Sequence, residues 1–295
     1  MSVICDMIFR KKENRSKKLF TRTAALLLSM LIALSMTACS GGSEYSKAMD
    51  AYKDSDYETA RVHFEKAMLE KEVEPGCIVA YGFDLVMLGE YEECINVVSR
   101  LTTGGDLYKL TETLIRDAYC VMAYAAFKMA DYGSAIDYYK ETKLVTDDPD
   151  ARDNIDSCIL ESYMRLFVQK MDEKPAMKAL VMDELVDYVG SCDRALSGRV
   201  YQFLAGMCIY MNDELPEQMS ADRDLLSMAE EYVSQAYKYD DVTVRDLEKY
   251  SIIIAERRGK ADVAYKLLDV FVMHFPDEES AVTEQAFLMN RMGER

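Results

Sequence analysis

The sequence predicts an all-α fold built from antiparallel helix pairs. Half of its 295 residues are apolar, while Gly (13) and Pro (5) are scarce, a composition that favours helices. The stretch DYETARVHFEKAM, residues 56–68, places Tyr57, Ala60, Phe64 and Ala67 on one helix face. The two alanines leave room for a second helix to approach closely. We therefore interpret this stretch as the second helix of a helical hairpin.

The same spacing returns three times along the chain. The equivalent residues are Tyr91, Cys94, Val98 and Leu101, then Tyr132, Ala135, Tyr139 and Thr142, and finally Ala261, Ala264, Leu268 and Phe271. A small residue also falls where the first helix of each of the first three pairs is expected to cross the second: Ala48, Gly82 and Ala123. The first two copies lie 34 residues apart, and the sequence resembles tetratricopeptide repeats over 42–149 and again over 245–276.

This resemblance implies a right-handed superhelical array of antiparallel helix pairs, a tetratricopeptide-like α-solenoid with about thirteen helices. Three clear repeats are expected at 44–149. Helices with a weaker repeat pattern follow at 150–240. A further repeat and a C-terminal capping helix are expected at 241–295.

Local signals set the expected helix ends in the clear repeats. The first repeat should contain helices at 45–53 and 57–71. Gly89 should end the first helix of the second repeat in a left-handed C-cap. Asp106 or Thr111 should cap the long helix that runs to Met129.

Helical spacing continues through the weaker region, at 154–170, 175–188, 195–211 and 221–239. Asp193 and Ser220 are candidate N-caps, and Pro175 suits a first helical turn. A final helix is expected at 278–292.

The N-terminus has the layout of a secretory signal. A basic start precedes an apolar run at 24–36 that is shorter than the roughly 20 residues needed to span a bilayer. The sequence Met36-Thr37-Ala38-Cys39 resembles the lipobox of bacterial lipoproteins, which implies cleavage after residue 38 and a diacylglycerol thioether on Cys39. The alternative is an ordinary signal peptide followed by an incidental cysteine. Residues 39–43 would form a short lipidated tether.

Lipidation would place the folded part on the outer face of the cytoplasmic membrane, or on an outer membrane if the host has one. Removal of residues 1–38 leaves 28 basic and 50 acidic residues, a net charge of −22. Such a chain repels nucleic acid, which excludes that class of partner, and it favours basic partners. A solvated acidic surface with no partner is the plainer interpretation.

Six cysteines follow Cys39: Cys77, Cys94, Cys120, Cys158, Cys192 and Cys208. An even number in an exported chain is compatible with disulfides. No CxxC pair is present, however, and Cys94 occupies a small-residue packing position, which favours buried thiols that act as small apolar groups.

The sequence shows no catalytic motif. It contains no G-x-S-x-G, no H-E-x-x-H and no phosphate-binding loop. Its acidic pairs fall at expected helix ends and turns, where such residues serve as caps. We expect no cofactor, no metal and no enzymatic activity.

In tetratricopeptide repeats the first helix of each pair lines the concave face. The resemblance places eight residues there as a partner-binding groove: Tyr45, Met49, Tyr52, Phe83, Met87, Tyr124, Phe127 and Lys128. The family's carboxylate clamp needs Lys, Asn and Arg at several of these positions, so a clamp for an acidic C-terminus is not expected. The alternative is that these aromatic residues pack between neighbouring helices.

The expected function is that of a membrane-anchored lipoprotein that binds a protein or peptide near the membrane surface, as a scaffold or assembly adaptor. One alternative is a lipoprotein that binds a solute or peptide. A less favoured one is a cell-wall hydrolase. The sequence does not indicate an oligomeric state.

Overall fold

The computed structural model describes residues 43–103, 110–192, 196–215, 224–278, 280–281, 283–285 and 288–289. The described residues form two compact units that divide between Val168 and Gln169. Each unit is described by itself.

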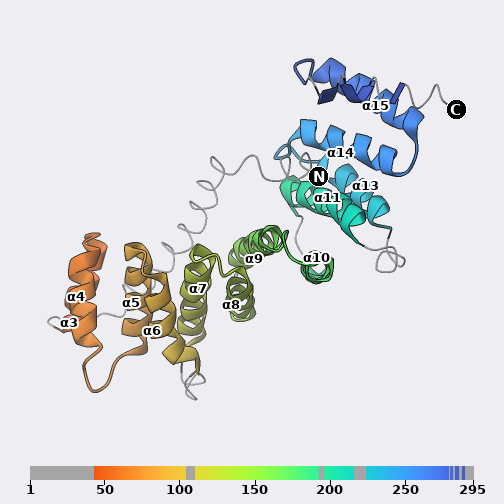
Figure 1. The fold of residues 1–295 in the computed structure, drawn as a ribbon. Coiled ribbons are helices and arrows are strands. Elements are labelled where there is room, and N and C mark those ends of the chain that lie inside the picture. Colours follow the sequence, from red (N-terminus) through yellow and green to blue (C-terminus); the bar gives the residue numbers. More distant parts are fainter. Residues whose placement is uncertain are drawn as a thin grey trace. The chain divides into compact units, whose positions relative to one another are not determined.

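The first unit consists of three helical hairpins and one further helix. Its helices are α3 (Glu44–Lys53), α4 (Tyr57–Ala67), α5 (Pro75–Leu88), α6 (Tyr91–Thr103), α7 (Glu112–Lys128), α8 (Tyr132–Leu144) and α9 (Pro149–Gln169). Helix α3 packs on α4, α5 on α6 and α7 on α8, and each hairpin also contacts the next through α4–α5, α6–α7 and α5–α7 (Figure 1). This repeated neighbour-to-neighbour contact is the pattern of a solenoid of helix pairs.

The second unit continues with α10 (Pro175–Ser191), α11 (Gly198–Glu214), α13 (Leu225–Ala236), α14 (Val244–Arg257) and α15 (Ala261–His274). Helix α11 pairs with α13 and α14 pairs with α15. Helical residues recur within 280–289. The described residues contain no strand, so the predicted all-α array of helix pairs is confirmed. Among them, no helix combines the length and the apolar character needed to cross a membrane.

Small residues allow the helices of the first unit to cross closely. A Cβ atom added to Gly82 of α5 would overlap the side chain of Val98 in α6 and would lie 3.5 Å from Cγ1 of Val121 in α7. Ala48, Ala60 and Ala123 are fully buried. The predicted close crossings are therefore present, and Gly82 lies where three helices meet.

Helices α5 and α7 form the interior of this unit. Every residue from Val79 to Val86 is buried, as is every residue from Cys120 to Ala126. The six cysteines predicted to remain after the lipid site form no disulfide bond with one another, and all except Cys192 are buried. Burial raises the pKa of the Cys94 thiol to about 12, so it packs as a small neutral group.

Four hairpin turns share one backbone conformation. A single residue adopts a positive φ in each: Ser55 (61°), Gly89 (83°), Ala130 (61°) and Gly259 (69°). The amide that follows each of them donates to a carbonyl five residues earlier, as from Glu90 to Leu85 at 2.8 Å. This bond is the outer one of the Schellman motif that ends many helices. The left-handed C-cap predicted at Gly89 is confirmed.

Several predicted helix ends are confirmed and others shift. Thr111 caps α7 by accepting a hydrogen bond from the Leu114 amide at 3.3 Å, and Pro175 begins α10. Helix α9 begins at Pro149, five residues before its predicted start, because Asp148 Oδ2 accepts a hydrogen bond from the Ala151 amide at 3.1 Å.

Helix α4 ends at Ala67, earlier than predicted. The amides of Leu69 and Glu70 donate to carbonyls three residues back, at 3.1 Å each, which tightens the last turn. The predicted signal segment, Cys39 and the proposed caps Asp193 and Ser220 lie outside the described residues, as does part of the predicted final helix.

The shared turn conformation predicts opposite effects for two reciprocal substitutions. Gly89→Ala should lower the free energy of unfolding by about 1 kcal/mol, since a side chain is disfavoured at positive φ. No atom lies within 4 Å of the Cβ it would add, so the backbone alone sets the loss. Ala130→Gly should raise the free energy of unfolding by a similar amount. Urea unfolding of both variants measures this, and a loss in both would mean that the two turns are not equivalent.

Candidate protein-binding site

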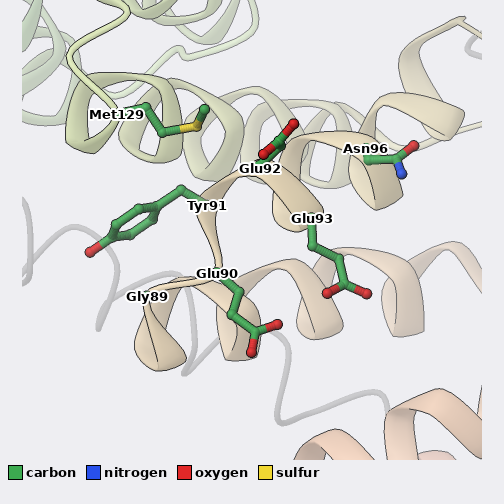
Figure 2. Close-up of a pocket in the computed structure, with 7 residues that line it drawn as sticks. All are labelled: Gly89, Glu90, Tyr91, Glu92, Glu93, Asn96 and Met129. Atoms are coloured by element: carbon green, nitrogen blue, oxygen red, sulfur yellow. The ribbon is translucent and has the colours of Figure 1, made fainter.

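A hollow of about 730 Å³ lies where α6 begins and α7 ends. Its lining combines acidic, apolar and amide side chains: Gly89, Glu90, Tyr91, Glu92, Glu93, Asn96 and Met129 (Figure 2). Six of these belong to the turn and first turns of α6 in the second hairpin, and Met129 belongs to the turn of the third. The hollow therefore bridges two neighbouring repeats.

The left-handed turn at Gly89 positions the acidic side chains. It redirects the chain into α6, where the Cys94 amide donates to the Glu90 carbonyl at 3.0 Å and starts the helix. Glu92 and Glu93 then fall in the first turn, where the positive end of the helix dipole favours carboxylates. Glu90 and Glu93 point to the same side, whereas Tyr91 points away from them (Figure 2).

One guanidinium forms ion pairs with three carboxylates beside the hollow. Arg61 of α4 pairs with Glu90, with Glu93 at 3.5 Å and with Glu65 at 2.9 Å. Burial and a hydrogen bond with Glu90 raise the pKa of Glu93. Glu92 is exposed. The carboxylates thus outnumber this guanidinium, which gives the rim of the hollow a negative potential.

Apolar side chains complete the site. Met129, which lines the hollow, is 45% exposed. Met87, at the end of α5, is 49% exposed but does not belong to the lining. The Tyr91 ring is half-buried, and the ammonium of Lys128 lies 6.0 Å from its centroid. Exposed methionines adapt their shape to a bound surface, and tyrosine combines a ring with a hydrogen-bonding hydroxyl. The hollow can therefore accept a chain segment that has both an apolar and a basic side chain.

The structure separates the eight residues of the predicted groove into three groups. Met49, Tyr52, Phe83 and Tyr124 are buried, Tyr45 and Phe127 are half-buried, and Met87 and Lys128 are exposed. Phe83 and Tyr124 pack between helices because α5 and α7 are enclosed along most of their length. Met49 and Tyr52 of α3 belong to the same buried cluster, which is what the packing alternative expects. Met87 and Lys128 are the exposed members, and the Lys128 ammonium lies 6.0 Å from the centroid of the Tyr91 ring in the hollow.

Ring contacts hold two of the aromatic members, Tyr52 and Phe127, against the second helix of their hairpins. Tyr52 meets Tyr57 of α4 edge-on at a centroid distance of 5.3 Å, and Phe127 meets Tyr132 of α8 in the same way at 5.4 Å. Each contact joins the two helices of one hairpin across its turn. Such pairs stabilise by roughly 0.5–1.5 kcal/mol beyond the burial of area.

Sequence reasoning missed the residues of the hollow itself. The available signal was Gly89 in a left-handed C-cap followed by three glutamates around an aromatic residue. Taken alone, these features predict only a helix cap and the repeat spacing. The sequence predicts Met129 only as a helix end, and its proximity to α6 follows from the packing of α7 on α6.

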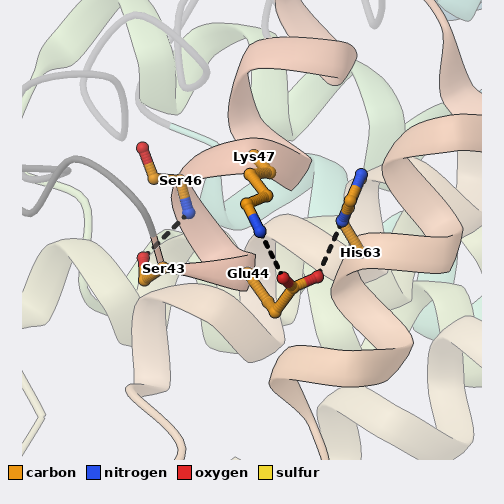
Figure 3. A network of polar contacts seen from close by, with 5 residues as sticks. All are labelled: Ser43, Glu44, Ser46, Lys47 and His63. Carbon is orange, nitrogen blue, oxygen red and sulfur yellow. Dashed lines mark hydrogen bonds and ion pairs between the residues drawn. The ribbon is translucent and has the colours of Figure 1, made fainter.

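A second polar network fixes the start of the first hairpin. Lys47 Nζ donates to Glu44 Oε1 at 2.6 Å, and His63 Nδ1 lies 2.7 Å from Glu44 Oε2 (Figure 3). The hydrogen bonds from Lys47 and His63 lower the pKa of Glu44 to about 2. Ser43 caps α3 by accepting a hydrogen bond from the Ser46 amide at 3.1 Å. This network joins α3 to α4 and has the geometry of a structural brace.

The described residues offer no group of three or more His, Cys, Asp or Glu side chains arranged to hold a metal ion. Of the two histidines, His63 pairs with Glu44, and His274 Nδ1 lies 2.8 Å from Glu248 Oε1. Both imidazoles therefore sit beside a carboxylate.

Asp84 of α5 is a buried carboxyl group without a hydrogen-bond partner. Its side chain is fully buried, and neither oxygen receives a hydrogen bond. Burial raises its pKa to about 7, against the opposing influence of the Arg61 charge. Below that pH the group is neutral, which avoids the cost of an isolated buried charge.

Comparisons with known proteins add little to this description. No protein-family model matches the chain, and no curated protein matches it either. Among solved structures, a complex of the TPR2AB domain of yeast Sti1 with pHSP90 is similar over 83% of this chain and 95% of that one, at 15% identity and a TM-score of 0.34. A structure of Naa15/Naa10 bound to HypK-THB is similar over 83% of this chain and 39% of that one, at 11% identity and a TM-score of 0.33. Superpositions this loose carry no argument, so the fold assignment rests on the helix pairs themselves.

The state of Asp84 predicts a pH-dependent difference in stability. The pKa of Asp84 in the folded state lies above the ordinary value of 3.8. Its burial therefore does not lower the free energy of unfolding below about pH 4, whereas that free energy falls as the pH rises through about 7. Asp84→Asn keeps the shape and removes the titration. The free energy of unfolding of this variant should equal that of the natural chain at pH 4 and exceed it by about 2–4 kcal/mol at pH 8. Urea unfolding at both pH values measures this, and a difference that does not change with pH would contradict it.

Proposed function

We propose that this chain is a protein-binding scaffold whose first unit receives a segment of a partner protein at the hollow between the second and third hairpins. The observation that supports this most is the hollow itself, in which an exposed methionine, a tyrosine and three glutamates from two repeats surround one space. A volume of this size lies within the usual range of roughly 300–1,000 Å³ for binding pockets. Repeat arrays present such surfaces on rigid supports.

The chemistry of the hollow suits a segment with a lysine or arginine next to an apolar side chain. The basic group would pair with Glu92 and with the carboxylates that share Arg61, while the apolar side chain would pack on Met129. Complementary charge speeds the encounter, and contacts in the desolvated centre set the affinity. The chain's net charge of −17 acts in the same direction over longer range.

We further propose that the chain is exported and anchored by lipid at Cys39. The support is the order of a basic start, an apolar run and a lipobox-like ending in the sequence. A four-residue Gly/Ser tether reaches only about 11 Å, so binding would take place close to the membrane surface. A tether of this kind raises the effective concentration of partners on the same membrane.

A two-by-two comparison in cells tests the anchor and the binding site separately. A photo-crosslinking amino acid at Asn96 reports on the hollow, and the same group at the exposed Leu144 of α8 serves as the control position. In the natural chain we expect a discrete crosslinked adduct from Asn96 in the membrane fraction and none from Leu144. Glu92→Lys should abolish the adduct and leave the chain in the membrane. Cys39→Ala should remove the chain from the membrane fraction or leave it unprocessed.

Glu141→Lys, on α8, is the matched charge reversal away from the hollow and should change neither result. An adduct that survives Glu92→Lys, or that forms equally from Leu144, would contradict the proposed binding site. An unchanged membrane fraction and normal signal cleavage in Cys39→Ala would contradict the anchor alone.

A further inference from the structure

Helix α15 carries a second apolar face that nothing in the described chain covers. Its first face, with Ala261, Ala264, Leu268 and Phe271, is buried against α14 and the residues near the C-terminus. A separate row stays exposed, consisting of Val263 (39%), Leu267 (36%), Val270 (41%) and Met273 (67%). These four residues recur at intervals of four, three and three, so they lie on one side of the helix. We call this row the α15 stripe.

The hairpins of the first unit do not repeat this stripe, although their seventh position can serve packing, as at the buried Val97. Val263, Leu267 and Val270 occupy the third, seventh and tenth positions of the second helix of their hairpin. The same positions hold Thr59, His63 and Lys66 in α4, Glu93, Val97 and Arg100 in α6, and Ser134, Tyr138 and Glu141 in α8. The third position is polar and the tenth is charged in all three of those helices. Only α15 among these four is apolar at all three positions.

We propose that the α15 stripe is the contact surface of a homodimer, in which two copies of α15 pack antiparallel about a two-fold axis. A two-fold interface must be complementary to itself. The stripe meets this condition if the axis passes between residues 267 and 268. Leu267 then faces Leu267 of the second copy, and Val263 of each copy lies over the region of residues 270–272 of the other.

The charges along the edge of the stripe fit the same arrangement. Lys266 and Asp269 are both exposed and lie on one edge. With the axis at this place, Lys266 of one copy lies opposite Asp269 of the other, and the symmetry creates the pair twice. Asp269 Oδ1 accepts a hydrogen bond from Gln285 at 3.1 Å, which leaves Oδ2 for the lysine.

Sedimentation velocity of the full chain in a mild non-ionic detergent, over a wide range of concentration, tests the proposal. The natural chain should show a reversible monomer–dimer equilibrium. Leu267→Asp should raise the dimer Kd by more than about tenfold, because two carboxylates would meet at the centre of an apolar interface. Leu144→Asp, at the 78% exposed residue of α8, is the matched control and should leave the Kd unchanged. Circular dichroism of each variant confirms that it is folded.

A charge exchange tests the axis itself. Lys266→Asp alone should weaken the dimer, and the combination with Asp269→Lys should restore it. Oxidation of Leu267→Cys should link two copies, whereas Val263→Cys should not, since its two copies would lie about 13 Å apart along the helices. The natural chain without an added cysteine gives the background from Cys192.

A natural chain that stays monomeric at every concentration would overturn the proposal, including the case in which the stripe instead binds vesicles or another protein. A dimer that persists unchanged in Leu267→Asp would overturn it as well. If oxidation linked two copies of Val263→Cys as efficiently as two copies of Leu267→Cys, that result would overturn the antiparallel arrangement. None of these outcomes bears on the hollow of the first unit, which is a separate surface.

Discussion

The close approach of three helices at Gly82 is the constraint on which the first unit depends. A single added carbon would overlap Val98 of α6 and would touch Val121 of α7 at an ordinary contact distance, so the close spacing of α5 and α6 is set at one residue. Because α5 is held from several sides, its residues from Val79 to Val86 are all buried, which makes α5 an interior helix. The turn at Gly89 then fixes where α6 begins relative to α5. It thereby also fixes the position of the acidic residues at the rim of the hollow.

The interior of each unit also contains a buried ionisable group, and the two groups differ in how many hydrogen bonds and ion pairs they form. In the second unit the Lys178 side chain is 3% exposed, and its ammonium donates to Tyr210 Oη at 3.0 Å, Glu214 Oε2 at 3.0 Å and the Met171 carbonyl at 3.2 Å. Three donors meet three acceptors, so the buried charge is fully bonded and joins α10 to α11. Asp84 in the first unit has no such partner, and its burial raises its pKa to about 7, so the neutral acid is favoured below that pH.

The sequence was sufficient for the fold class and for most hairpins, because small and aromatic residues recur at fixed offsets. Ala60, Gly82 and Gly89 play the roles that their residue types predict. The left-handed turns at Ser55 and Ala130 could not be predicted in this way, since neither residue prefers that conformation and only the Schellman bonds reveal the equivalence.

The candidate site was harder to predict than the fold. Helical periodicity assigns Phe83 and Tyr124 to a face of their helices, but it does not say whether that face meets solvent or another helix. The structure buries both, while Met87 and Lys128 stay on the surface. The hollow was missed because its residues come from two turns that are distant in sequence, and only the packing of α7 on α6 brings Met129 to Tyr91.

The stability of Gly82→Ala, measured beside Gly190→Ala, tests the central constraint most directly. Glycine within a helix normally costs roughly 0.5–1 kcal/mol relative to alanine, so relief of that cost alone would stabilise both variants. No atom lies within 4 Å of a Cβ added at Gly190 of α10, and Gly190→Ala should therefore be neutral or stabilising. Gly82→Ala should instead lose roughly 1–3 kcal/mol, because the added carbon overpacks the crossing. Equal gains in both variants would show that the helices do not meet closely at Gly82 and would contradict this account.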